Sequence, residues 1–338
     1  MKIGVLRRLL RWPEAGSLIG LIAVYLIFSI LGGSNFMGVK GLSSWLNVAA
    51  EVGIIALPVG LLMIGGYLDI SVGSIVPASS LTVALMSNHY GMPIIVGISG
   101  GLLVGLLAGY INGQLVTRTT IPSLIITIGT MFGIMGLALG FTILIKGSTG
   151  VFLVADPVTK AILGSALGGM FKIAIFWWLG FVAVFFFLLH ISRWGNSVFA
   201  LGGDRESARN AGVDTQKLTV QLYMLSGLAA AFVGVLQIIA NSNAQVAAGS
   251  TFIFNSIMCV AIGGIALTGG AGSVIGIFLG TIIFSMVTQG VFYSGLDNNL
   301  VSVVIGVMFL IAVLSNESFR TFAQNYGAKN FSAKAKSK

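Results

Sequence analysis

Long uncharged stretches recur along the whole of this chain. A bilayer span needs about 20 predominantly apolar residues, and each charge at its centre costs roughly 3 kcal/mol. Only 8% of the 338 residues are charged and 56% are apolar, proportions that exclude an ordinary soluble domain. We therefore predict an all-α, polytopic transmembrane bundle, in which 47 glycines let the helices pack closely in lipid.

Apolar runs and the polar breaks between them predict about ten spans. The runs lie at residues 17–31, 45–66, 73–87, 94–116, 121–145, 173–191, 218–240, 253–267, 271–291 and 299–315. The third and the eighth are short for a crossing of about 30 Å, so we expect tilted, half-length or re-entrant helices there. No A-x-A-like cleavage site follows the first run, which we therefore interpret as a retained span rather than a signal peptide.

The basic residues predict the orientation of these spans. With ten spans and an inside N-terminus, 14 of the 18 basic residues lie on the cytoplasmic side, and only Lys40, Lys146, Lys160 and Lys172 lie outside. Both termini are then cytoplasmic. We predict a cytoplasmic N-terminus over 1–16, a transmembrane domain over 17–316 and a basic cytoplasmic tail over 317–338 that lies near anionic lipid.

Several functions are disfavoured by what the sequence lacks. It has no G-x-x-x-x-G-K-[ST] phosphate loop, no G-x-S-x-G and no H-E-x-x-H motif, so we expect no catalytic residues. Its two histidines, His89 and His190, fall at opposite membrane faces, and Cys259 is its single cysteine, so we expect no metal site. The basic residues follow the topology, which argues against nucleic-acid binding.

One polar segment, over residues 193–217, lies between two apolar runs and falls on the cytoplasmic side in this topology. Gly202-Gly203 is expected to break the chain, Asp204 to cap a helix of about two turns, and Gly212 to end that helix in the left-handed conformation. Such a rigid, charged element offers a soluble partner a place to dock. The alternative is a solvated connector, which explains the charges but not the bracketing glycines.

A few polar side chains fall within or beside the spans, and the candidates for a translocation path are Asp69, Ser71, Asn112, Ser123 and Thr127. An ionisable group at the membrane edge is a functional candidate by default. For Asp69 or Ser71 the alternative is a cap on the third span, and for the other three it is an interhelical hydrogen bond. Glu51 carries a similar ambiguity near the outer part of the second span.

Two further regions have more than one interpretation. The segment IGGYLDISVGSI at 64–75 is similar to IGGIALTGGAGSV at 262–274, and this pairing predicts parallel pseudo-repeats made of spans one to four and seven to ten. The external loop at about 146–172 either contacts an external partner or is a plain connector.

Five segments together resemble the membrane subunit of bacterial ABC importers of the ribose and monosaccharide type. They recur in that family's order from about Val52 to Gly280, and they read GGYLDISVGS, INGQLVTRTTIPSLIITIGTM, GNSVFALGGDRESARNAGV, YMLSGLAAAFVGVL and IGGIALTGGAGSVIGIFLGT. The chain departs from the family's usual GGIDLS, because GGYLDIS is one residue longer before Asp69. It also has Asp204 where the family often has Asn, and both residues cap helices well.

The resemblance implies a type II importer fold in the bacterial inner membrane, working with a second permease copy or a paralogue. An ATP-binding subunit would bind below and carry the ATP and Mg²⁺, while a periplasmic substrate-binding protein would bind above. The coupling residues that it implies are Gly203, Asp204, Arg205, Glu206, Ala208, Arg209, Asn210 and Gly212. The expected mechanism is alternating access for a neutral sugar or sugar-like solute.

Two other classes stay open at this point. A secondary transporter or channel would carry small neutral solutes without an ATPase, and a membrane enzyme is disfavoured by the missing catalytic residues. The sequence leaves open whether the cargo is a pentose, a hexose, a sugar-like signal or a nucleoside.

Overall fold

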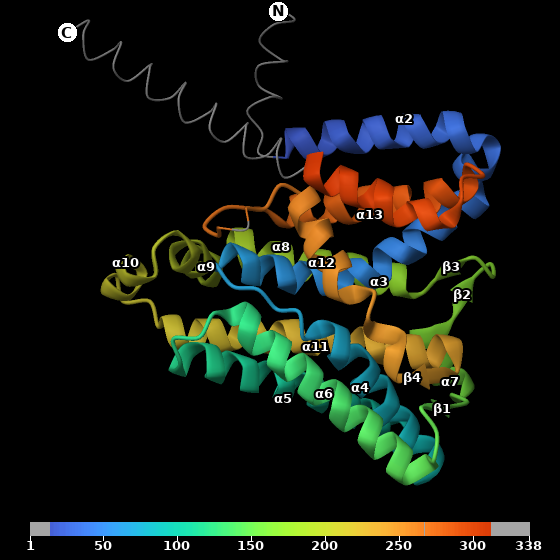
Figure 1. Cartoon of the computed structure of the whole chain (residues 1–338), viewed down its shortest axis with the longest axis horizontal. Coiled ribbons are helices and arrows are strands. Elements are labelled where there is room, and N and C mark those ends of the chain that lie inside the picture. The colour runs from blue at the N-terminus through green and yellow to red at the C-terminus, as the bar shows by residue number, and fades with distance from the viewer. Residues whose placement is uncertain (1–13, 267, 312–338) are drawn as a thin grey trace, which may run out of the picture.

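The computed structural model describes residues 14–266 and 268–311, and it forms an elongated helical bundle whose helices run roughly along one axis (Figure 1). The long helices are α2 (Ala15–Met37), α3 (Val39–Ile64), α5 (Ile94–Arg118), α6 (Ser123–Lys146), α11 (Thr215–Asn241) and α13 (Val274–Tyr293). α8 (Ala174–Phe186) continues into η3 (Phe187–Ile191). Within the described residues, these make seven helices long and apolar enough to cross a membrane.

Shorter helices complete the bundle and its two ends. They are α4 (Val72–Ala84), η1 (Leu85–His89), α7 (Pro157–Thr159), η2 (Lys160–Gly164), α9 (Arg193–Gly203), α10 (Arg205–Asn210), η4 (Val246–Gly249), α12 (Phe252–Ile262) and η5 (Asn298–Leu300). An apolar helix at Val301–Ile311 ends the described part. Every predicted span thus has a helix, and the third and eighth spans correspond to the short α4 and α12. The predicted domain limits at 1–16 and 317–338 lie largely outside the described residues.

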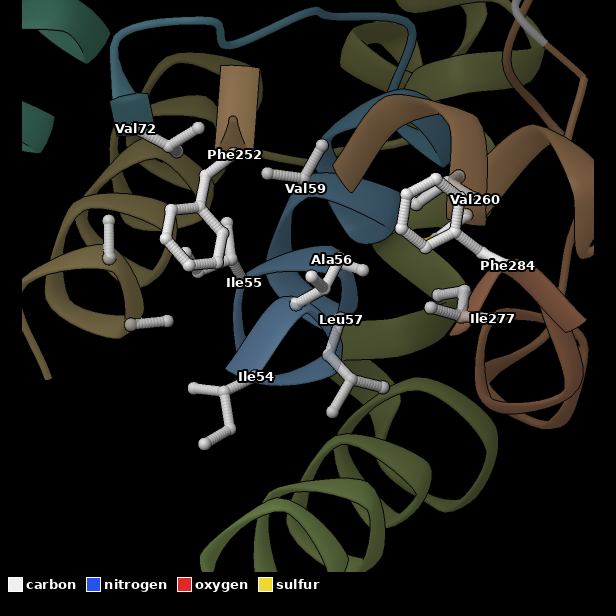
Figure 2. Packing of buried hydrophobic residues seen from close by; sticks show 14 of the residues in the cluster. Ile54, Ile55, Ala56, Leu57, Val59, Val72, Phe252, Val260, Ile277 and Phe284 are labelled. Carbon is white, nitrogen blue, oxygen red and sulfur yellow. The ribbon is translucent and has the colours of Figure 1, made fainter. Parts of the chain in front are cut away.

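Helix α3 forms the centre of the bundle. It is mostly apolar and is buried almost continuously from Ala49 to Ile64, as expected for a helix surrounded by other helices. Figure 2 shows its side chains, such as Val59, between Phe252 and Val260 of α12 and Ile277 of α13. In contrast, α6 has few buried residues, so most of its surface is free to face lipid or another chain.

Helices α5 and α11 approach each other through glycines. A Cβ atom added at Gly105 would overlap the carbonyl oxygen of Gly227, and one added at Gly227 would overlap that of Gly105. Small residues of this kind allow backbones in lipid to pack at close range. The high glycine content therefore has the packing role that the sequence predicts.

Short strands gather at the end of the bundle opposite α9 and α10 (Figure 1). β1 (Gly150–Phe152) pairs antiparallel with β4 (Asn243–Gln245), and β2 (Ala166–Leu167) pairs with β3 (Phe171–Lys172). The loop between α6 and α8 is therefore ordered by pairing with the segment that follows α11. We call this the strand end, and the opposite one the α10 end.

The two similar sequence segments end their helices in the same way. After α3, the amides of Gly65, Gly66 and Tyr67 donate to Leu61, Met63 and Leu62, at 2.9, 3.0 and 2.9 Å. After α12, the amides of Gly263, Gly264 and Ile265 donate to Cys259, Ala261 and Val260, at 3.0, 3.0 and 3.3 Å. Gly66 and Gly264 are both left-handed, with φ of +85° and +89°. The shared Schellman-type geometry supports the predicted parallel repeat.

Candidate functional site

The first candidate site is the α10 end, where α10 is a short helix with both of its ends capped. The Asp204 carboxylate accepts a hydrogen bond from the Ser207 amide at 2.7 Å. This bond lowers the pKa of Asp204, so the cap is ionised at neutral pH. At the other end, Gly212 is left-handed with φ +87°, and the Val213 amide donates to the Ala208 carbonyl at 3.0 Å. The predicted cap and stop are confirmed.

One local prediction is wrong. Gly202 and Gly203 do not break the chain, because α9 runs through both, and the break falls at Asp204, which has extended backbone angles of −155° and 111°. Glycine tolerates a helical conformation at a modest cost, and a close contact described below accounts for Gly202.

The side chains of α10 divide into an exposed set and one anchor. Arg205, Glu206, Arg209 and Asn210 are exposed, whereas Ala208 is 3% exposed and packs inward. An α-helix places residues three and four apart on one face, so the charged side chains form a compact outward surface. We call the segment 204–212 the α10 knob.

Helix α9 fixes the α10 knob to the bundle. Ser192 caps α9 by accepting from the Gly195 amide, and the Trp194 indole donates to the Gln221 side chain of α11 at 3.0 Å. Val198 and Leu201 are buried. The knob is therefore carried by an element with its own apolar anchors and is not part of a loose loop.

The second candidate site is a buried polar cluster between α3 and α4. Both oxygens of Asp69 are paired. Oδ1 accepts from the Ser71 amide and hydroxyl at 2.9 and 2.6 Å, and Oδ2 accepts from Ser226 of α11 at 2.8 Å. Asn112 of α5 donates to the Ser71 hydroxyl at 2.8 Å. Asp69, Ser71, Asn112 and Ser226 are all fully buried, so the cluster joins three elements inside one subunit.

The backbone before Asp69 is held by one further helix, α6, and by a second residue of α11. Ser123 of α6 accepts from the Leu68 amide at 3.2 Å, and the Tyr223 hydroxyl of α11 donates to the Leu68 carbonyl at 3.0 Å. Thr127 is buried and donates to the Leu124 carbonyl of its own helix. Ser226 and Tyr223 were not among the candidates selected from the sequence. The feature of the sequence that could have indicated them is a polar group in an otherwise apolar span.

The five candidate path residues do not line the groove that lies between two of the long helices. A groove of about 280 Å³ lies where α5 and α6 meet, and its lining is Leu115, Thr119, Ile121, Ile125, Ile126, Gly129 and Thr130. None of the five is among these residues. Within residues 14–266 and 268–311, no group of three or more His, Cys, Asp and Glu could hold a metal ion.

Glu51 of α3 has a defined partner set at the strand end. Its carboxylate pairs with the Lys172 ammonium of β3 at 2.6 Å and accepts from Gln237 of α11 at 3.0 Å. Asn47 of α3 accepts from the Lys172 amide and donates to the Met170 carbonyl. Glu51 and Asn47 therefore attach the loop between α6 and α8 to α3 and α11.

The chain was compared with known protein families and with individual proteins. Residues 41–313 match the model of the family described as branched-chain amino acid transport system, permease component. The chain is 32% identical over 318 residues to the fructose import permease protein FrcC of Rhizobium meliloti, covering 92% of this chain and 87% of that protein.

Two further relatives have a similar extent. The ribose import permease protein RbsC of Escherichia coli K12 is 28% identical over 304 residues, which cover 89% of this chain and 92% of that protein. The autoinducer 2 import system permease protein LsrD of Yersinia enterocolitica is 31% identical over 266 residues, which cover 78% of this chain and 79% of that protein. The similarity thus extends over nearly the whole of the described structure.

Proposed function

This chain belongs to the family of transport-system permease components, and from that membership we propose that it forms the path of an ATP-driven importer for a sugar or sugar-like neutral solute. It is a multi-pass membrane protein and not an enzyme. The observation that carries the proposal is the near full-length similarity to permeases named for the import of fructose, ribose and autoinducer 2.

The charges of the bundle interior fit a neutral cargo. The salt bridge found in the described residues, Glu51 with Lys172, lies at the strand end, and Asp69 is enclosed by hydroxyl donors. A path for an ion needs compensating charge within the membrane, whereas a polyol needs hydroxyl and amide partners. We therefore favour a sugar over an ion as the cargo.

For the α10 knob we propose the docking role, with the ATP-binding subunit as its partner. The supporting observations are the two caps, the buried Ala208 anchor and the exposed Arg205 and Arg209. A capped helix keeps its shape under load, so it can pass on a displacement that a flexible loop would absorb. In this proposal the α10 end and both termini are cytoplasmic, the membrane is the bacterial inner membrane, and ATP and Mg²⁺ stay on the partner.

The remaining partners follow from the same proposal. A periplasmic substrate-binding protein meets the strand end, and a second permease copy or a paralogue completes the path. The cluster around Asp69 supports the wall of this path, because Ser71 and Asn112 reach a solute only when the surrounding helix ends separate. Closure of the ATP-binding subunits moves the α10 knob and alternates access between the two sides.

Co-purification tests the proposal. The wild-type chain in detergent is expected to retain its ATP-binding subunit, and the Arg205→Glu/Arg209→Glu variant is expected to lose it because two exposed charges are reversed. The matched control is Lys146→Glu/Lys160→Glu, which reverses two exposed charges toward the strand end and is expected to leave the association intact. Full retention in the Arg205→Glu/Arg209→Glu variant would remove the docking role of the knob.

Uptake into proteoliposomes separates the importer from a secondary transporter or channel. We expect entry of radiolabelled D-fructose or D-ribose to require the ATP-binding subunit. It should also require ATP on the side of the membrane where that subunit binds. Uptake by the permease alone, without nucleotide, would establish the alternative instead.

A further inference from the structure

Three glycine pairs from distant parts of the chain meet at the α10 end. They are Gly65-Gly66 after α3, Gly202-Gly203 at the end of α9, and Gly269-Gly270 before α13. The Gly270 amide donates to the Ile64 carbonyl at 2.8 Å, which joins the two helix breaks directly. Figure 1 shows the end of α9 beside the end of α3. We call this meeting point the glycine hub.

Gly202 lies between the two breaks. Its backbone is helical, so its conformation does not require glycine. However, a Cβ atom there would overlap the Ile64 carbonyl oxygen and lie 2.7 Å from the Gly270 amide nitrogen. Gly202 is therefore required for close approach: any side chain would force α9 away from both breaks at once.

Gly269 and Gly270 also approach the other two segments closely. A Cβ atom at Gly269 would lie 2.9 Å from the Gly66 Cα and 3.1 Å from the Gly202 carbonyl oxygen, and one at Gly270 would lie 3.2 Å from the Gly203 Cα. All of these contacts are between backbones. Backbone contacts have no side-chain rotamers that could absorb a small displacement, so the three segments are expected to move together.

A second contact holds the end of the break between α12 and α13. The His190 Nε2 atom, at the end of η3, accepts a hydrogen bond from the Val274 amide at 3.2 Å, at the first residue of α13. The segment from η3 to α9 thus contacts the break between α12 and α13 near its middle through Gly202 and at its end through His190.

We propose that the glycine hub is the mechanical link by which a displacement of the α10 knob reaches α3 and α13, with Gly202 as the positioning residue. This inference rests on the proposed function, because it assigns the route that the partner's movement takes through the chain. The knob follows Gly203 directly, and α3 lies at the centre of the bundle, so one junction connects the docking surface to the core.

Hydrogen–deuterium exchange in the assembled complex tests the link. In the wild type, ATP binding by the partner is expected to change amide exchange in three regions together: 204–212, 64–71 and 262–274. In Gly202→Ala, the knob is expected to respond to ATP as before, while the ATP-dependent change at 64–71 and 262–274 falls at least about fivefold, the low end of typical coupling between sites. Gly180→Ala is the control, because a Cβ atom there meets no atom of the described residues within 4 Å.

Three outcomes of this experiment would contradict the proposed link. A wild-type response at the knob without one at 64–71 and 262–274 overturns the link, even when Gly202→Ala fails to insert. A Gly202→Ala variant that responds like the wild type also overturns it. If no ATP-binding subunit associates with the wild type, the proposed function itself fails, and the link fails with it. This third outcome can be distinguished from the first two, because in those the α10 knob still responds to ATP.

Discussion

Ser226 donates its hydroxyl to the Oδ2 atom of Asp69 at 2.8 Å, although 157 positions separate the two residues. Asp69 has no basic residue among its hydrogen-bond partners, and both of its oxygens are satisfied by hydroxyl and amide donors. The bond connects the break after α3 to the middle of α11. It therefore fixes a buried carboxyl group and two elements of the bundle at once.

The first prediction removes this donor. Ser226→Ala is expected to lower the free energy of unfolding by about 1–3 kcal/mol, because it leaves a buried oxygen without a partner. Chemical denaturation in detergent measures the loss. Ser99→Ala is the control, since Ser99 is exposed and bonds within its own helix, and it is expected to stay within about 0.5 kcal/mol of the wild type.

A double-mutant cycle makes this prediction specific. In Asp69→Asn, the new amide group can donate to the Ser226 hydroxyl, so the pair survives without a carboxyl group. Removing Ser226 in that background is expected to cost less than removing it from the wild type, because the unpaired group is then neutral. Equal costs in both backgrounds would show that the carboxyl group of Asp69 adds nothing to the bond with Ser226 beyond what a neutral amide provides.

The second prediction concerns the repeated helix ends. Gly66→Ala and Gly264→Ala are each expected to destabilise the chain by about 1–2 kcal/mol, because both positions are left-handed. Among the described residues, added Cβ atoms come no nearer than 3.9 and 3.7 Å to other atoms, so backbone strain is the main cost at both. Denaturation of the two variants tests their equivalence. A loss confined to one position would contradict the shared geometry.

Local features of the fold could be predicted from the sequence, because they depend on neighbouring residues. Asp204 and Gly212 bracket α10 through contacts within a few positions, and an apolar run of span length is visible wherever it occurs. Gly202 shows the limit. Its glycine suggested a break in the chain, whereas the structure uses it for contact with Ile64, which lies 138 positions earlier.

The polar cluster shows the same limit. Asp69 and Asn112 could be selected as candidates since polar residues are rare in the spans. Their joint position, however, depends on how α5 and α11 pack against the break. Ser226 looks like any other small residue of a membrane helix, and no local pattern distinguishes a buried partner from a surface serine. Tertiary packing supplied the missing information.

The third prediction uses the pH dependence of the α10 knob. The hydrogen bond from Ser207 lowers the pKa of Asp204 below its ordinary value of 3.8. A depressed folded-state pKa means that the cap stabilises α10 above 3.8 and loses this effect as the pH falls through the folded-state value. A nitroxide label at Asn210→Cys is therefore expected to keep constant mobility from neutral pH down toward 3.8 and to become more mobile below it.

Two variants give the controls for this measurement. Asp204→Asn keeps a capping oxygen without a titrating group, so its label mobility is expected to stay flat across the same range. Asp204→Ala has no cap and is expected to be mobile at every pH. Native Cys259 is fully buried, which favours labelling at the introduced cysteine. Titration that persists in Asp204→Asn would assign the effect to another group.

The fourth prediction concerns the attachment of the loop between α6 and α8 at the strand end. The side chains of Lys172 and Glu51 are 35% and 17% exposed, so their ion pair is only partly screened by water. Lys172→Met is expected to lower stability by about 1 kcal/mol and to expose the loop to protease, with the difference from the wild type shrinking at high salt. The exchanged pair, Glu51→Lys with Lys172→Glu, is expected to restore protection, because Gln237 can present its carbonyl oxygen to a lysine in place of its amide. Protection that persists in Lys172→Met would mean that the hydrogen bonds of Asn47, rather than the charges, hold the loop on α3.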